Sequence, residues 1–226
     1  MTRRLSLPPD RPVLRFSPYA WAKLCCFCHR GDTEIGGFGI SRPDDLLLVE
    51  DFVTLRQGAT FVSVAFDDDA VADFFEAQVE VGRRPEQFAR IWIHTHPADC
   101  PQPSTTDEAT FQRVFGSCSW ALMFILARGG QTYCRLRFNA GPGGAMLIPS
   151  EVDFSLPFPA SDHDAWQAGY LRDVRASTLR TRWRPLNPWN DRRGLEQPSR
   201  ASFEPSLSVD QPDIELNDCE VPRCTI

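Results

Sequence analysis

Hydrophobic and polar positions alternate along this chain with two different periods. In four segments apolar residues recur every three or four positions, which predicts helices at 18–29, 67–82, 106–115 and 163–174. Short apolar or β-branched runs between polar, Pro or Gly turns predict strands at 34–41, 46–53, 60–66, 90–94, 120–128 and 132–138. Ser17 is the expected N-cap of the first helix, and Gly31 its stop. Gly129 and Gly130 separate the last two strands, which we expect to form a hairpin.

The composition changes near Ser177. The segment 177–226 has six prolines and few branched apolar residues, and it is richer in arginine up to Arg193 and richer in acids from Glu204. We therefore expect one domain at 1–176 followed by an extended or disordered tail. The tail tryptophans Trp183 and Trp189 could pack back on the domain or bind a partner, and the sequence does not choose between the two.

Length and charge narrow the class of protein. A chain of 226 residues with 42% hydrophobic content can bury one sizeable core. The net charge of −6 argues against general affinity for nucleic acid or anionic membranes. No apolar run approaches the roughly 20 residues of a membrane span, and prolines break the N-terminal segment where a signal peptide needs an apolar core. A cytoplasmic location is expected, where the eight cysteines would mostly stay reduced.

Metal-binding side chains gather in the stretch IWIHTHPADCPQPSTTD, residues 91–107. Side chains alternate between the two faces of a strand, so His94 and His96 project from the same face. Pro97 then ends the strand, and Asp107 falls in the first turn of the next helix, where the helix dipole favours a carboxylate. Two imidazoles and one carboxylate form a three-ligand zinc set that leaves a fourth tetrahedral position for water, the arrangement typical of catalytic zinc.

Hydrolysis at such a site needs a general base from elsewhere in the chain. Glu34, at the start of the glycine-rich strand EIGGFGI, is the candidate that would take a proton from the attacking water and pass it to the leaving amine. Glu50 and Asp99 are the next candidates. The hydroxyl of Ser104 could stabilise the oxyanion of a tetrahedral intermediate. Ser104 also opens the capping-box pattern STTDE, and the two roles could coexist.

Glu34, the run His94-Thr95-His96-Pro97, the pair Pro103-Ser104 and Asp107 together resemble the JAMM motif of MPN-domain zinc peptidases, over about residues 19–174. The resemblance implies a single MPN domain with an α/β fold, a mixed sheet flanked by helices like that of cytidine deaminases. It implies one zinc ion held by both histidines and the aspartate, with the glutamate as base and the serine as oxyanion partner.

The activity that this resemblance implies is hydrolysis after the C-terminal glycines of a ubiquitin-like protein. The chain is most similar to bacterial and phage members, some of which act beside E1-like and E2-like enzymes. Deconjugation and precursor trimming remain open, as do two alternatives: processing of sulfur-carrier proteins, and a non-catalytic MPN module that only binds. We expect the substrate tail to add along an open cleft beside the strand 34–41, and the helix 67–82 to contact the ubiquitin-like domain.

A second cluster, CCFCH, contains Cys25, Cys28 and His29, the spacing of a c-type haem attachment motif. Haem attachment of this kind requires export, and no export signal is seen. The three side chains would share one helical face, so a weak second metal site is conceivable, but buried thiols are favoured. Cys100, in the loop between the predicted ligands, is a candidate for redox sensitivity.

Overall fold

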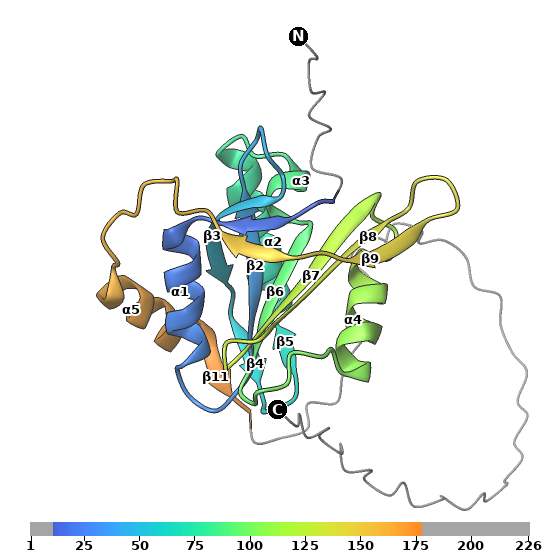
Figure 1. Cartoon of the computed structure of the whole chain (residues 1–226). Coiled ribbons are helices and arrows are strands. Elements are labelled where there is room, and N and C mark those ends of the chain that lie inside the picture. The colour runs from blue at the N-terminus through green and yellow to red at the C-terminus, as the bar shows by residue number, and fades with distance from the viewer. Residues whose placement is uncertain (1–10, 178–226) are drawn as a thin grey trace, which may run out of the picture. The chain divides into compact units, whose positions relative to one another are not determined.

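The computed structural model describes residues 11–177, in which helices flank a curled mixed sheet (Figure 1). Its helices are α1 (Pro18–Cys28), α2 (Asp68–Glu80), α3 (Pro85–Phe88), α4 (Thr105–Phe115) and α5 (His163–Asp173). Its strands are β1 (Leu14–Phe16), β2 (Ile35–Ser41), β3 (Leu48–Thr54), β4 (Gln57–Ala59), β5 (Val64–Phe66), β6 (Ile91–His96), β7 (Trp120–Ala127), β8 (Thr132–Phe138), β9 (Gly144–Leu147), β10 (Ser150–Val152) and β11 (Val174–Ala176). The predicted tail, apart from Ser177, lies outside the described residues, and so do Trp183 and Trp189.

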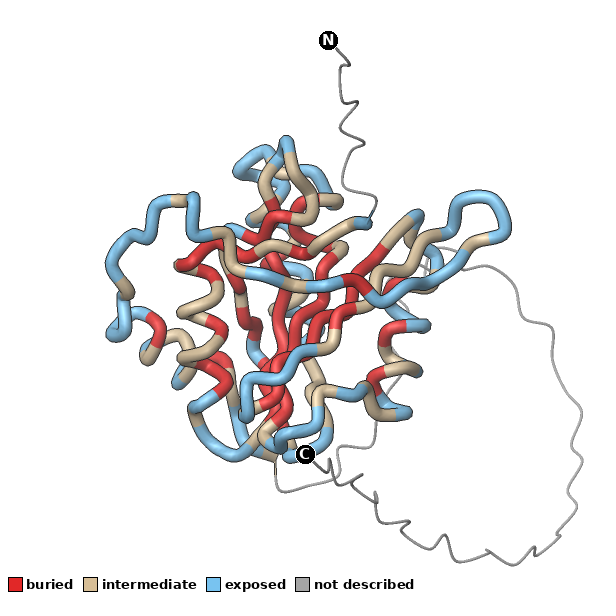
Figure 2. Tube along the Cα trace, viewed as in Figure 1, coloured by how far each residue is buried: buried red, intermediate tan, exposed pale blue. Residues whose placement is uncertain are grey.

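The main sheet has eight strands in the order β10-β1-β3-β2-β6-β7-β8-β9, and a small sheet has the order β11-β4-β5. Strand β2 runs antiparallel to both of its neighbours, whereas β6 and β7 are parallel, so the sheet is mixed. The central strands are buried along most of their length (Figure 2). This confirms the predicted α/β architecture of a mixed sheet with flanking helices.

Alternate residues of β6 feed two different apolar cores. Ile91 and Ile93 pack in the core beneath α1 and α5, which also contains Phe27 and Trp166. Trp92 faces the opposite core, formed with α2, α3 and α4. Since the period of a strand is two, His94 and His96 must share the face of Trp92. The sheet therefore places both histidines on the side covered by α4.

Glycines in β2 permit close approach of neighbouring chain segments. A Cβ atom at Gly37 would lie 2.3 Å from the carbonyl oxygen of Val53. At Gly36 it would lie 2.9 Å from Cγ1 of Val64 and 3.0 Å from the ring of Phe66, both on β5. The glycine-rich sequence is thus required by packing on both faces of this strand.

Most predicted helices and strands are present, and Ser17 caps α1 by accepting a hydrogen bond from the Ala20 amide at 3.1 Å. The predicted strand 60–66 is wrong in its first half. Residues 60–63 form a turn in which the Thr60 amide donates to the Ser63 carbonyl, and strand structure begins only at Val64. Phe61 and Val62 in that turn are exposed, so their apolar side chains did not indicate burial in a sheet.

The prediction of an open cleft beside the strand 34–41 is also wrong. Strand β2 is an interior strand, paired to β3 on one side and to β6 on the other. Its backbone is already hydrogen-bonded along both edges, so no extended peptide can add there. Within residues 11–177, no helix combines the length and the apolar content that a membrane crossing requires.

Candidate metal centre

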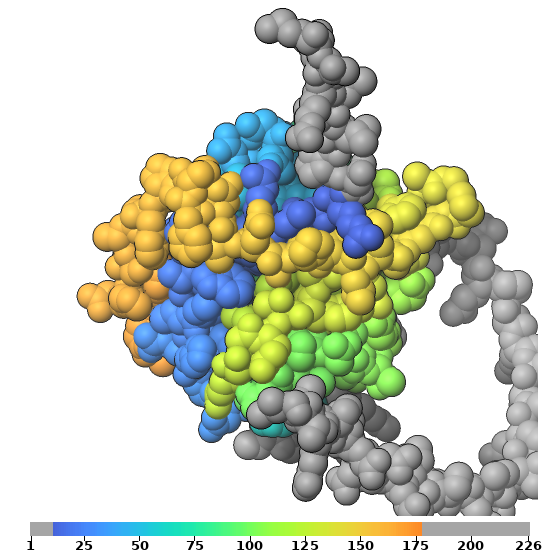
Figure 3. Space-filling model, viewed as in Figure 1, coloured from blue at the N-terminus to red at the C-terminus, as the bar shows by residue number. Residues whose placement is uncertain are grey.

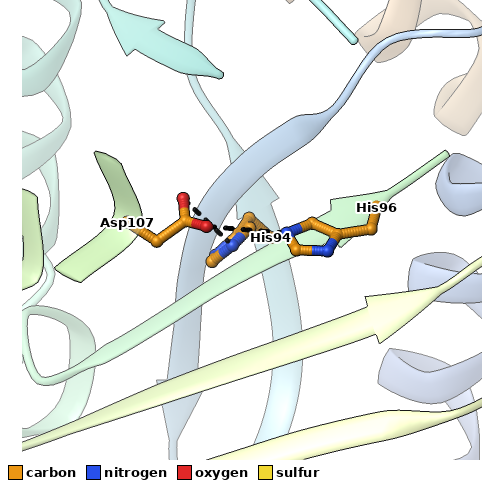
Figure 4. Close-up of side chains that lie close together, drawn as sticks. All are labelled: His94, His96 and Asp107. Atoms are coloured by element: carbon orange, nitrogen blue, oxygen red, sulfur yellow. Dashed lines mark ion pairs between the residues drawn. The ribbon is translucent and has the colours of Figure 1, made fainter. Parts of the chain in front are cut away.

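The three predicted ligands converge in the structure (Figure 4). His94 and His96 lie at the end of β6, and Asp107 lies in the first turn of α4. Nε2 of His94 is 3.5 Å from Oδ1 of Asp107, and Nε2 of His96 is 3.7 Å from Oδ2 of the same carboxylate. All three residues are buried, and their ligand atoms lie within 4.8 Å of one another. The group could hold a metal ion.

The spacing fits a tetrahedral ion better than it fits direct hydrogen bonds. Two ligands about 2.1 Å from a zinc ion, separated by the tetrahedral angle, lie roughly 3.4 Å apart. The observed separations of 3.5 Å and 3.7 Å approach that edge length, and both are long for a hydrogen bond between nitrogen and oxygen. A small cation between these atoms would therefore need little rearrangement of the side chains.

Buried polar atoms without partners support the same interpretation. Both ring nitrogens of His94 and Nε2 of His96 are buried without a hydrogen-bond partner among the described residues, and so is Oε2 of Glu34. Such atoms normally find partners, because burying them unpaired costs about 1–3 kcal/mol each. Only one ring nitrogen of His94 can face a given ion, so one bound group could satisfy up to three of these atoms.

The protonation of the histidines suits metal binding. Burial lowers the pKa of His94, which keeps its imidazole neutral, the form that coordinates metals. Nδ1 of His96 lies 2.8 Å from the carbonyl oxygen of Cys100, to which it can donate, leaving the Nε2 lone pair for a metal. Burial would lower the pKa of His96, but Asp107, the Cys100 carbonyl and Glu34 together raise it. These neighbours favour a positive charge at His96, and a bound cation can supply that charge in place of a proton.

Asp107 is fixed by a capping box. Oδ2 of Asp107 accepts hydrogen bonds from the amide and the hydroxyl of Ser104, each at 2.7 Å, and the Asp107 amide donates back to Ser104 Oγ at 3.2 Å. Burial alone would raise the pKa of Asp107, but its interactions with His94, His96 and Ser104 hold that pKa far below its usual range. The carboxylate is therefore ionised. The capping role of Ser104 is confirmed, and its single hydroxyl hydrogen is directed at Asp107.

Glu34 reaches the same point from the adjacent strand. Its Oε1 lies 3.7 Å from Nε2 of His96, and its amide donates to the carbonyl of Thr60 at 2.8 Å. Burial, opposed by His96 and reinforced by the charge of Asp107, raises the pKa of Glu34 to about 8. A carboxyl group with a pKa shifted this far is typical of functional sites.

The other two candidate bases lie elsewhere. Glu50 is exposed on β3, and its carboxylate oxygen Oε1 lies 3.8 Å from Nε of Arg42. Asp99 is exposed in the loop after β6, beside the turn at Gly129. Neither belongs to the buried group, so Glu34 is the candidate that the structure brings to the ligands.

Two supporting residues escaped the sequence analysis. The side chain of Gln57 accepts from the Gly36 amide at 2.8 Å and donates to the Gly36 carbonyl at 2.9 Å, which anchors β2 next to Glu34. The Arg128 amide donates to the carbonyls of His96 and Ala98, and its guanidinium reaches Asp32 at 3.2 Å. These are long-range contacts between loops and strand ends, and no local sequence pattern signals them.

The cluster Cys25, Cys28 and His29 does not form a site. Cys28 is buried, and its Sγ donates to the carbonyl oxygen of Leu126 at 3.7 Å. Burial raises the pKa of the Cys28 thiol to about 11, so the group is an inert core thiol as favoured from the sequence. His29 is exposed at the end of α1, on the other side of the helix boundary. Cys100 is exposed, and its redox role remains a prediction.

Comparison with known proteins leaves the family of this chain open. No model of a known protein family matches the chain, and no curated protein matches its sequence. What the geometry establishes is a buried His94–His96–Asp107 group that could bind a metal ion, with a buried acid, Glu34, at its edge.

Proposed function

We propose that this chain is a zinc-dependent peptidase of the JAMM type, with a deaminase-like MPN fold, that cleaves after the C-terminal glycines of a ubiquitin-like protein. The observation that carries the proposal is the position of Glu34, whose carboxylate lies 3.7 Å from Nε2 of His96 without belonging to the three-ligand group. A structural metal site has no use for a further buried acid, whereas hydrolysis requires a general base at this place.

The side chains take distinct roles in this proposal. His94, His96 and Asp107 would hold the ion, because two neutral imidazoles and a carboxylate suit zinc. Bound zinc supplies a Lewis acid that polarises the scissile carbonyl and makes water more acidic. Glu34 accepts a proton from the attacking water at Oε2, an atom without a hydrogen-bond partner among residues 11–177, and returns it to the leaving amine.

The raised pKa of Glu34 is compatible with a basic role. Its value of about 8 applies when no cation is near. A bound divalent cation favours the ionised carboxylate and lowers that pKa, which brings it nearer to neutral pH. Ser104 would act as oxyanion partner only if its hydroxyl turned away from Asp107, to which it now donates.

An edge strand close to the site offers a place for the substrate tail. In the described part of the chain, β5 pairs with β4 alone, and its other edge is available for strand addition. Val64 and Phe66 of β5 pack on Gly36, which is the cross-strand partner of His94. A tail paired with β5 would therefore run beside the ligands, where glycines fit and larger side chains would meet these packed residues.

The alternatives differ in substrate or in activity. A sulfur-carrier protein with C-terminal glycines would use the same edge of β5, so precursor processing stays the runner-up within enzymes. A non-catalytic MPN module would have no need for the buried Glu34 beside His96. We further propose a cytoplasmic location and E1-like and E2-like neighbours, with neither nucleic acid nor membrane as partner, in keeping with the net charge of −6.

The experiment uses a ubiquitin-like protein with a Gly-Gly end, fused to a short peptide or joined to a lysine side chain. Zinc-loaded wild type should cut after the last glycine, as read by intact mass, and Glu34→Gln should lose about 100- to 10,000-fold in rate. Glu50→Gln, an exposed acid on β3, is the matched control and should cut normally. Equal rates for Glu34→Gln and wild type would exclude Glu34 as base, and inactive zinc-loaded wild type would favour the binding module.

A further inference from the structure

A hollow on the surface between α1 and α5 collects thiols and imidazoles away from the centre described above. It is lined by Ala22, Cys25, Cys26, His29, Arg30 and His163. Ala22, Cys25 and Cys26 lie on one face of α1, and His29 and Arg30 follow directly after this helix. His163 is the first residue of α5. On the face shown in Figure 3, the blue segment that contains α1 adjoins the orange segment that leads into α5.

Cys26 and His163 meet across this hollow. Sγ of Cys26 lies 3.9 Å from Nδ1 of His163, although 137 positions separate them in the sequence. In a tetrahedral zinc site, with the metal about 2.3 Å from sulfur and about 2.0 Å from nitrogen, these two atoms would lie roughly 3.5 Å apart. The observed separation exceeds this by a few tenths of an ångström, a gap that a small side-chain rotation closes.

The imidazole is held in position. Its ring packs edge to face on Trp166, with the ring centroids 5.1 Å apart. Trp166 is buried and donates from Nε1 to the hydroxyl of Tyr19 on α1 at 3.1 Å. Asp162 caps α5 by accepting from the Ala165 amide at 2.9 Å. The donor pair is therefore built on two helices that are already docked.

Cys25 and His29 line the same hollow, but they do not bring a third ligand atom within 4.8 Å of both Cys26 and His163. Cys25 is half-buried, and Nδ1 of His29 lies 2.9 Å from the carbonyl oxygen of Cys25, which leaves its Nε2 for another partner. Arg30 adds a positive charge to the hollow, which opposes a cation. Thiolate and imidazole ligands together select thiophilic metals over Mg²⁺ or Ca²⁺.

We propose that Cys26 and His163 form a second metal site for a thiophilic divalent cation of the Zn²⁺ or Cd²⁺ class, with water completing the coordination. The bound ion links the last helix of the domain to the first. Since such an ion binds the folded state, its binding stabilises the docking of α5.

Cadmium titration of the chelator-stripped, reduced, full-length chain tests this site without reference to catalysis. A thiolate bound to Cd²⁺ gives a charge-transfer absorption in the ultraviolet, whereas the His94–His96–Asp107 group contains no sulfur. The wild type should develop this absorption. Cys26→Ser should remove most of it, and His163→Ala should weaken the Cd²⁺ affinity at least about tenfold, since even outer-shell partners matter on that scale.

Control variants replace other thiols: Cys100 and Cys118, which do not line the hollow, and the two cysteines of the segment 178–226. Cys100→Ser, Cys118→Ser and the pair Cys219→Ser with Cys224→Ser should keep the absorption and the affinity of the wild type. Wild type without a thiolate absorption would overturn the proposal. It would equally fail if Cys26→Ser and His163→Ala both bound Cd²⁺ like the wild type, or if the absorption disappeared only in a control variant.

Discussion

Oε1 of Glu34 lies 3.7 Å from Nε2 of His96, and Glu34 directly precedes β2, the antiparallel neighbour of β6. The register of β2 and β6 pairs Ile35 with Thr95 and Gly36 with His94. Glu34 precedes Ile35 and His96 follows Thr95, so the two residues are next to each other at the end of this pairing. Their side chains lie on the face of the sheet that α4 covers. The candidate base thus stands at the start of the strand next to β6, and the glycine opposite His94 leaves room for Val64 and Phe66 of β5 to pack there.

Retention of zinc in the buried group should depend on its three ligands, and it is measured in a Cys26→Ser background so that the second proposed site does not contribute. Replacing His96 with alanine removes one of three ligands, so zinc that survives dialysis should fall from about one ion per chain to a small fraction. Elemental analysis gives the stoichiometry. Asp99→Asn, an exposed acid in the loop that leaves β6, is the control and should retain the ion. Equal zinc in both variants would refute the assignment of His96 as a ligand.

Ser104 and Ser17 form a matched pair for separating capping from catalysis. Each is an N-cap, and each hydroxyl makes a second hydrogen bond, Ser104 to Asp107 and Ser17 to the Glu50 carbonyl. Replacing either with alanine should cost about 1 kcal/mol of unfolding free energy, measured by urea titration. Only Ser104→Ala should also lower kcat on the Gly-Gly substrate. A normal kcat in that variant would leave Ser104 with the capping role alone.

The helices and the metal group could be predicted because their signals are local. Ser17 and Ser104 mark helix starts, and the alternation in β6 places His94 and His96 on one face whatever the rest of the fold does. The short strands β1, β10 and β11 were missed for the opposite reason. Each has three residues, too few for a period to show, and each is defined by pairing with distant segments.

Long-range pairing also explains the error about the substrate cleft. The strand 34–41 was expected to border an open cleft for a substrate tail, but the neighbours of β2 are the chain's own β3, β5 and β6. Sequence does not reveal which strand of a sheet is central. The contacts of Gln57 and Arg128 with the site depend on that same order of strands.

The loss of unfolding free energy on replacing a glycine with alanine should therefore depend on how close the new Cβ atom comes to its neighbours. Gly37→Ala places it 2.3 Å from a backbone oxygen of β3, and Gly36→Ala places it 2.9 Å from a side chain of β5. Gly58→Ala, whose nearest neighbour would lie 4.0 Å away, is the control. We expect Gly36→Ala to lose about 1–3 kcal/mol of unfolding free energy, Gly37→Ala more, and Gly58→Ala little. Urea midpoints in another order would mean that β5 does not pack on β2.

The stability of the metal-free protein should depend on pH through Glu34. Its pKa is raised from 4.5 to about 8 in the folded state, mainly by burial. Between these values the unfolded chain releases a proton that the folded chain keeps, so the unfolding free energy falls as the pH rises. For one group the slope cannot exceed about 1.4 kcal/mol per pH unit. Below pH 4.5 and above about 8 this contribution is constant.

Glu34→Gln removes that proton and isolates its effect. With chelator present, the difference in unfolding free energy between this variant and the wild type should shift in favour of the variant from about pH 5 to about pH 8, and then level off. His94, His96 and Asp107 titrate in both proteins, so their direct contributions largely cancel in the difference. A flat difference for Glu34→Gln would mean that Glu34 is hydrated and ionised throughout. Added zinc should reduce the slope, since a cation beside the carboxylate favours its charged form in the folded state.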